Sequence, residues 1–133
     1  MSKKIVVGIS GASGVVYGVR LLSVLSEKNV ETHLIISNSG EKNIQIETDY
    51  NIDEVKKMAS YVYDHKNMAA KVASGSFLVD GMVVVPCTIK TLSGIANSYS
   101  ENLIVRAADV TLKEKRKLVL VVRETPLHKG HLG

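Results

Sequence analysis

The chain has 133 residues and a formal net charge of +4, with 45% hydrophobic and 23% charged residues. This composition excludes a disordered or collagen-like chain and predicts one folded domain over residues 1–133. The single cysteine, Cys87, excludes an internal disulfide framework and suits a reducing cytoplasm. No apolar run reaches the length of a membrane span, and the lack of Trp with only one Phe argues against a stacking platform for single-stranded nucleic acid. We therefore expect a cytoplasmic protein that binds neither a membrane nor a nucleic acid.

The apolar pattern alternates along the sequence between strand-like runs and helical periodicity. Helical spacing starts at Val15 and stops near Lys28, and residues 40–73 are interpreted as helices with turns, although Tyr61 and Tyr63 alternate as at a strand edge. The other predicted elements are strands at 5–9, 32–37, 82–85 (ended by Pro86) and 118–122, and helices at 89–96 and 103–116. Strands that alternate with helices predict an α/β fold with a mostly parallel sheet covered on both faces. The last predicted strand is apolar on both faces, so we expect another subunit or a further segment to cover it.

A glycine-rich loop, Gly8-Ile9-Ser10-Gly11-Ala12-Ser13-Gly14, joins the first predicted strand to the first helix. Free N–H groups and the positive end of a helix dipole meet at such a place, which predicts phosphate binding, with the Ser10 or Ser13 hydroxyl as a donor. The loop is neither G-x-G-x-x-G nor a P-loop. Ser37 ends the second strand, where an NAD-binding fold would have an acidic residue. A mononucleotide is therefore favoured over a dinucleotide, and a tight turn without a ligand is the alternative.

A second polar segment, Pro86-Cys87-Thr88-Ile89-Lys90-Thr91, follows the third predicted strand and opens a helix. Its two threonine hydroxyls and its lysine belong to the same edge of the sheet as the glycine-rich loop, where open α/β sheets bind ligands. Thr is also a common N-cap residue, so this segment on its own indicates only a polar rim.

Several short motifs follow one another in a fixed order over nearly all 133 residues. They are Gly11-Ala12-Ser13-Gly14 with Tyr17-Gly18, Ser37, Glu47-Thr48, Ser74-Gly75-Ser76-Phe77, Pro86-Cys87-Thr88-Ile89-Lys90-Thr91-Leu92-Ser93-Gly94, Arg106-Ala107-Ala108-Asp109-Val110 with Leu112-Lys113-Glu114, and Arg123-Glu124-Thr125-Pro126-Leu127. In this order and spacing the sequence resembles the UbiX-type flavin prenyltransferase family, which includes the phenylacrylic acid decarboxylase-like flavoproteins. The family runs on for another strand and a long terminal helix with a tyrosine and an arginine that help to bind the prenyl phosphate, so we expect a C-terminally shortened protein.

The resemblance implies a three-layer Rossmann- or flavodoxin-like fold that holds FMN, which is reduced during turnover, and uses no metal. It implies transfer of a dimethylallyl group from dimethylallyl monophosphate to N5 and C6 of the flavin. The product is the prenylated flavin used by UbiD-type decarboxylases, in quinone synthesis or in aromatic acid decarboxylation. It also implies a homo-oligomer, a dodecamer, with active sites between subunits.

The resemblance also implies the residues of the site. The FMN contacts fall on Gly11, Ala12, Ser13, Ser37, Thr88, Ile89, Lys90, Thr91 and Arg123, and the catalytic and prenyl-phosphate residues fall on Ser13, Glu47, Arg106, Lys113 and Glu124. Arg106 and Lys113 are seven residues apart on one predicted helix, so their side chains share a face that can clamp a phosphate. A glutamate such as Glu124 can deliver a proton to the departing phosphate or shuttle one from the flavin.

Three other features could have a function but also have a simpler structural interpretation. The basic run from Lys113 to Lys117 is interpreted as a solvated helix end, and Cys87 as a small buried residue at a strand end. His128-x-x-His131 has the spacing of a ligand pair but no third ligand in view. Three functions stay open: a flavin prenyltransferase, an FMN-binding but catalytically impaired fragment of that family, and a basic nucleic-acid-binding domain supported only by charge.

Overall fold

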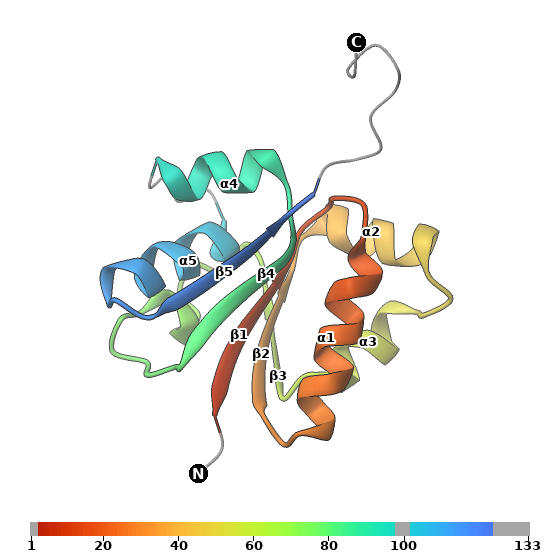
Figure 1. The fold of residues 1–133 in the computed structure, drawn as a ribbon, viewed down its shortest axis with the longest axis horizontal. Helices are drawn as coiled ribbons and strands as arrows, with labels where there is room; N and C mark the ends of the chain where they lie inside the picture. The colour runs from red at the N-terminus through yellow and green to blue at the C-terminus, as the bar shows by residue number, and fades with distance from the viewer. Residues whose placement is uncertain (1–2, 98–101, 124–133) are drawn as a thin grey trace.

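The computed structural model describes residues 3–97 and 102–123, which form a five-stranded parallel sheet between two layers of helices (Figure 1). The strand order is β3-β2-β1-β4-β5, and every neighbouring pair is parallel. The elements in sequence order are β1 (Lys4–Ile9), α1 (Val15–Glu27), β2 (Glu31–Ile36), α2 (Asn38–Glu47), α3 (Ile52–Met58), β3 (Tyr61–Asp64), the short 3-10 helix η1 (Lys71–Ala73), β4 (Gly81–Cys87), α4 (Ile89–Ala96), α5 (Leu103–Lys113) and β5 (Lys117–Val122). The predicted three-layer α/β fold is confirmed, and the order matches the first five strands of a Rossmann sheet.

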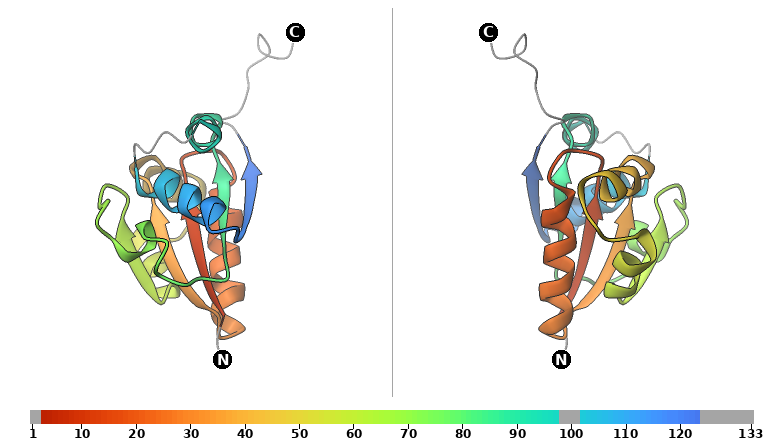
Figure 2. Two further views of the ribbon diagram at one scale, coloured as in Figure 1. Left: turned by 90° about the vertical axis from the view of Figure 1, so that its left-hand side faces the viewer. Right: turned by 90° about the vertical axis from the view of Figure 1, so that its right-hand side faces the viewer.

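Figure 2 shows the helices on both faces of the sheet. One apolar cluster lies between the sheet and each helical layer. Successive residues of the central strands point to opposite faces, so that Val6 packs with the α5 layer while Val7 packs with α1. Both residues are at most 2% exposed. This two-sided burial explains why the central strands are almost uninterrupted apolar runs in the sequence.

The predicted helical segment 40–73 contains a strand, which corrects one prediction. Tyr61–Asp64 forms the edge strand β3, whose Tyr61 is the register partner of His33 on β2. The strand has only four residues, and three of them are exposed, so it lacks the apolar run that marks the central strands. Its assignment depends on pairing with β2, which lies about thirty residues earlier in the sequence.

Two predicted boundaries are also wrong. β4 does not stop before Pro86 but continues to Cys87, and the β4–β5 register shifts between Val84 and Cys87. A proline is tolerated there because it sits at an irregularity of the ladder, where its missing N–H is not needed. Helix α5 ends at Lys113 instead of 116, because Lys115 adopts a left-handed conformation with φ of 58°.

Strand β5 is covered on only one face in the described part of the protein. Leu118 and Leu120 pack against the cluster beneath α5, whereas Val119 and Val121 on the other face are 44% and 39% exposed. The apolar character of both faces is therefore present, as predicted. Within residues 3–97 and 102–123, no helix is both long enough and apolar enough to cross a membrane.

Candidate functional site

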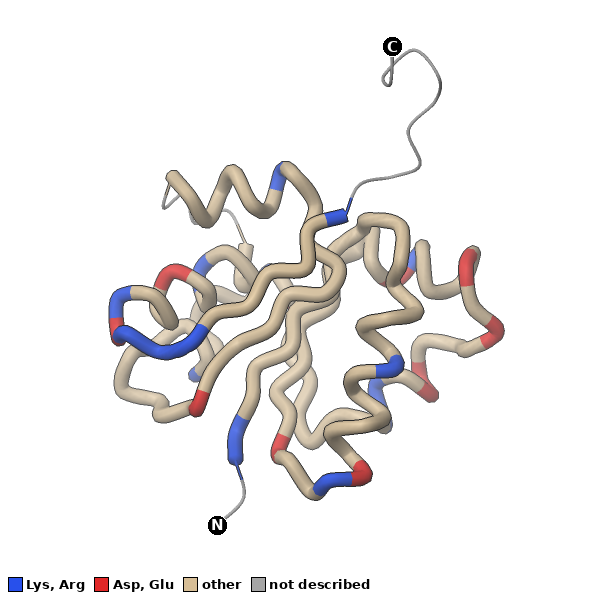
Figure 3. The backbone as a smooth tube through the Cα atoms, in the orientation of Figure 1, with Lys and Arg blue, Asp and Glu red and all other residues tan. Residues whose placement is uncertain are grey.

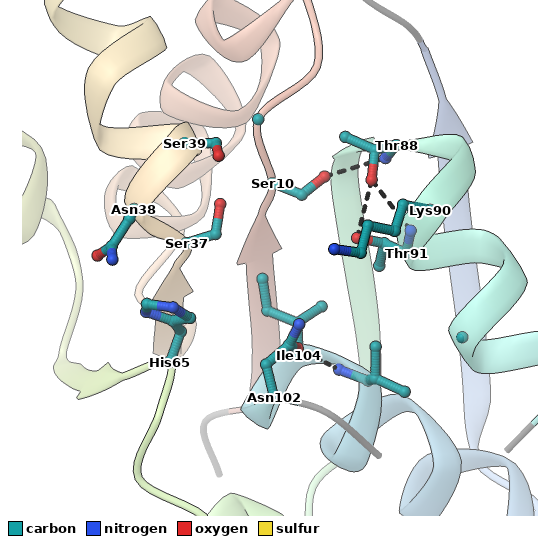
Figure 4. A pocket seen from close by; sticks show the side chains of 13 residues that line it. Ser10, Ser37, Asn38, Ser39, His65, Thr88, Lys90, Thr91, Asn102 and Ile104 are labelled. Carbon is teal, nitrogen blue, oxygen red and sulfur yellow. Dashed lines mark hydrogen bonds between the residues drawn. The ribbon is translucent and has the colours of Figure 1, made fainter. Parts of the chain in front are cut away.

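A cavity of about 440 Å³ opens at the carboxyl edge of the sheet, where β1, β2 and β4 end (Figure 4). Its lining comes from the ends of these strands and the residues directly after them, from the segment after β3, and from helices α2, α4 and α5. The lining residues are Ser10, Gly11, Ser37, Asn38, Ser39, His65, Thr88, Lys90, Thr91, Gly94, Asn102, Ile104 and Val105. This is the edge at which the glycine-rich loop and the second polar segment were predicted to meet.

Three helices begin at this cavity, and each begins with a side-chain cap. The side-chain oxygens of Ser37, Thr88 and Asn102 each accept a hydrogen bond of 3.0 Å from a backbone N–H in the first turn of α2, α4 and α5, respectively. The positive ends of three helix dipoles therefore converge on one space, together with the Lys90 side chain. Such a space favours a polar or anionic ligand group.

Ser10 fastens the glycine-rich loop to the end of β4. Its hydroxyl donates to the Pro86 carbonyl oxygen at 2.7 Å and accepts from the Thr88 N–H at 3.0 Å, and the residue is 3% exposed. The hydroxyl proton is thus engaged within the protein. Of the two serines predicted to donate to a phosphate, Ser13 is the one whose hydroxyl is not committed in this way.

Two predicted residues from distant elements lie beside the glycine-rich loop. Glu47, at the end of α2, accepts a hydrogen bond of 3.0 Å from the N–H of Gly14, whose φ of 94° is left-handed. Arg123, directly after β5, donates its backbone N–H to the Cys87 carbonyl, and its guanidinium lies 5.7 Å from the centre of the Tyr17 ring. The tertiary structure therefore brings Glu47 and Arg123 to the start of α1.

The remaining predicted contacts are distributed differently. Thr88, Lys90 and Thr91 line the cavity with Gly11 and Ser37, whereas Ala12 is fully buried in the core and Ile89 is 49% exposed. Figure 4 shows Lys90 and Thr91 facing Ser10 and Ser37 across the opening. The two polar segments predicted from the sequence thus lie side by side at one cavity, joined by the hydrogen bond from the Thr88 N–H to Ser10.

Arg106 and Lys113 do not line the cavity, and the structure does not bring them together there. The Arg106 Nε donates to the Ala73 carbonyl at 3.3 Å, at the end of η1. The Lys113 ammonium pairs with the largely buried Asp109 carboxylate at 3.0 Å, at the opposite end of α5 from the cavity. Their predicted phosphate clamp stays a prediction. Glu124 and the His128–His131 pair lie outside the described residues.

Figure 3 shows the basic run at the turn between α5 and β5. Two of its cations, Lys113 and Arg116, have partners within the protein. The Arg116 guanidinium donates to the carbonyls of Phe77 and Gly75 at 3.1 and 2.8 Å, and Lys113 pairs with Asp109. A cation in the last turn of a helix also interacts favourably with the helix dipole. These contacts support the interpretation of the run as a helix end.

Cys87 is fully buried at the end of β4, as predicted. Burial raises the pKa of its thiol to about 11, because the thiolate would lose its hydration. The side chain therefore stays a neutral thiol at physiological pH, which argues against a nucleophilic role.

Several cavity residues were not among the predicted site residues, and Asn102 and His65 show why. Asn102 carries a local signal, because Asn directly before a helix is a typical N-cap residue. His65 follows the unpredicted strand β3, and its carbonyl accepts a 2.7 Å hydrogen bond from the N–H of Leu103 at the start of α5. No pattern in the sequence could place His65 there, since the contact joins residues nearly forty positions apart.

Comparison with known proteins gives consistent matches over nearly the whole sequence. The model of the flavoprotein family matches residues 1–131. The flavin prenyltransferase UbiX of Thauera aromatica is 56% identical over 97% of this chain, which covers 66% of that protein. This chain therefore spans about two thirds of the length of this curated relative.

Two solved structures are similar at the level of the backbone. One is AnUbiX (PadA1) in complex with FMN and dimethylallyl pyrophosphate, with a TM-score of 0.92 and 50% identity over 99% of this chain and 70% of that chain. The other is a dodecameric FMN-dependent UbiX-like decarboxylase from Escherichia coli O157:H7, with a TM-score of 0.90 and 49% identity over 97% of this chain and 71% of that chain.

Proposed function

Because the chain belongs to the flavoprotein family and, within it, to the UbiX-type flavin prenyltransferases, we propose that it binds FMN and transfers a dimethylallyl group to the reduced flavin. The donor is dimethylallyl monophosphate, whose allylic C–O bond breaks as the bond to the flavin forms. The observation that carries this proposal is the 50–56% identity to flavin prenyltransferases over 97–99% of the sequence. FMN, when bound and reduced, supplies the electron-rich ring that attacks the allylic carbon.

The cavity at the carboxyl edge of the sheet fits FMN in size and chemistry. Its volume of about 440 Å³ lies within the roughly 300–1,000 Å³ of small-molecule sites. The glycine-rich loop, the helix N-termini around it and Lys90 supply N–H groups and positive charge for a phosphate, and the Ile104 and Val105 side chains supply an apolar wall for a flat ring. The residues present therefore support FMN as the cofactor, held within a single domain.

The proposed roles of individual residues differ in how much the structure supports them. Gly11, Ser37, Thr88, Lys90 and Thr91 line the cavity, which supports their assignment as FMN contacts. For Ala12, Ser13 and Ile89 the assignment depends on their neighbours in the same two loops, and Glu47 and Arg123 lie beside the start of α1. For Arg106, Lys113 and Glu124, the role in binding the prenyl phosphate or moving a proton rests on family membership.

We further propose that the protein works in the cytoplasm as a homo-oligomer, of which the dodecameric relative is one example. The prenylated flavin passes to a UbiD-type decarboxylase, because a modified cofactor needs an apoenzyme to receive it. An FMN-binding but catalytically impaired protein is the second candidate, since neither Arg106 nor Lys113 lines the cavity.

The test of the proposed function is a mass spectrum of the flavin released after anaerobic incubation with reduced FMN and dimethylallyl monophosphate. A gain of one five-carbon unit is expected. Unmodified FMN that stays with the protein would support the second candidate, and failure to retain any FMN would contradict both. Ser13→Leu should abolish FMN retention by filling the loop, whereas Ser26→Leu, at an exposed position of α1, should leave it unchanged.

A further inference from the structure

Asn43 is a partly buried residue of α2 whose side chain reaches the glycine-rich loop. Its Nδ2 donates to the carbonyl oxygen of Gly11 at 2.7 Å and to that of Ala12 at 3.3 Å. One amide group thus holds two consecutive carbonyls of the loop. These contacts join residues more than thirty positions apart, and neither the family resemblance nor the lining of the cavity draws attention to Asn43.

The two hydrogen bonds determine where the backbone N–H groups of the loop point. In a trans peptide the C=O and the N–H of the same unit point in opposite directions. The carbonyls of Gly11 and Ala12 face α2, so the N–H groups of Ala12 and Ser13 point away from α2 and lie on one side of the loop. Ala12 is fully buried and Ser13 is only partly buried, so the Ser13 N–H, just before the left-handed Gly14, is the one that an anion can reach.

Within the described ranges, the N–H of Ser13 has no hydrogen-bond acceptor, whereas the N–H of Gly14 donates to Glu47. α1 also begins without a side-chain cap, unlike α2, α4 and α5. The loop therefore presents one oriented donor, the N–H of Ser13, at the start of a helix. Only an external acceptor would use it.

We propose that Asn43 is a positioning residue for the FMN phosphate, acting through the N–H of Ser13. This inference rests on the proposed function, because it takes FMN as the cofactor and the glycine-rich loop as its phosphate site. The role needs the N–H donors of an amide: Asp would place carboxylate oxygens against two carbonyls, and Ala would leave the carbonyls without a partner. α2 itself does not need Asn43, since Asn is a poorer helix former than Ala.

The test compares FMN with riboflavin, which has the same ring and ribityl group but no phosphate. Dissociation constants are measured by quenching of flavin fluorescence for the wild type, Asn43→Ala and Asn43→Asp. Gln45→Ala and Gln45→Glu are the matched controls, because Gln45 is exposed on the same helix and undergoes the same chemical changes. We expect Asn43→Ala to weaken FMN at least tenfold and riboflavin less than twofold. Asn43→Asp should weaken FMN further, and the two controls should change neither.

The ratio of the two dissociation constants separates positioning from general damage. Equal losses of FMN and riboflavin in both Asn43 variants would show a structural role and overturn the inference, as would wild-type FMN affinity in Asn43→Ala. If Asn43→Ala does not fold, the isosteric Asn43→Asp decides by the same ratio. A wild-type protein that binds FMN no more tightly than riboflavin would instead refute the phosphate site on which the inference rests. A wild-type protein that binds neither flavin would refute the proposed function itself.

Discussion

Gly11→Ala tests the packing of the glycine-rich loop against the first turn of α2. A Cβ atom at position 11 would overlap the Cβ of Ser39 and lie 3.1 and 3.2 Å from the carbonyl carbon and the Cα of that residue. These backbone atoms belong to the start of α2, which also carries the Ser37 cap, so they cannot move without shifting the helix. Both Gly11 and Ser39 line the cavity.

The expected loss of stability follows from these contacts. Overpacking of this kind costs about 1–3 kcal/mol. At roughly 4 °C per kcal/mol for a domain of this size, the melting temperature should fall by about 4–12 °C. FMN binding should weaken as well, because the displaced residues form one wall of the cavity.

The assay is thermal and urea unfolding of Gly11→Ala, Ser39→Gly and the double variant. Ser39→Gly removes the atom that overlaps, so the double variant should recover about half of the loss, with a coupling energy of about 1 kcal/mol. Gly75→Ala is the control, because its new methyl would meet only the end of the Glu114 side chain, at 3.0 Å. A Gly11→Ala protein as stable as the wild type, or no recovery in the double variant, would refute this account of the loop.

Two further predictions concern buried titratable groups. Burial lowers the pKa of His33 below its ordinary 6.5, against the opposing effect of Glu31, so the unfolded protein takes up a proton at a higher pH than the folded one. The contribution of neutral His33 to stability is therefore complete above about pH 6.5 and falls as the pH drops below it. The urea midpoint should decrease between pH 7.5 and 5.5, and this decrease should be smaller in His33→Gln. An identical pH dependence in the variant would exclude His33 as its source. The thiol of Cys87 has a pKa of about 11 in the folded protein, against 9.0 for a free thiol. A thiol reagent at pH 8 should therefore label the folded protein at least about 100-fold more slowly than the protein unfolded in urea. Equal labelling rates would contradict the burial of Cys87.

The sequence alone determined the features that depend on local pattern. The buried strands could be predicted because a strand covered on both faces, such as β1, must be apolar at nearly every position. The glycine-rich loop and the second polar segment could be placed at one edge, because parallel strands all end at the same side of their sheet. The burial of Cys87 could be predicted because it is a small residue at the end of an apolar strand.

The tertiary structure alone decided which of these segments meet, and how. Strand β3 exists because it pairs with β2, and His65 reaches the cavity only because it follows that strand. The sheet order places α2 beside the loop after β1, so Asn43 and Glu47 can hydrogen-bond to a loop that precedes them by more than thirty residues. Helical spacing predicted that Arg106 and Lys113 share one face of α5. In the structure, the Arg106 side chain donates to the Ala73 carbonyl, while Lys113 pairs with Asp109. The physical reason is that periodicity and capping are properties of neighbours in sequence, whereas these contacts depend on the packing of whole elements, which no single segment encodes.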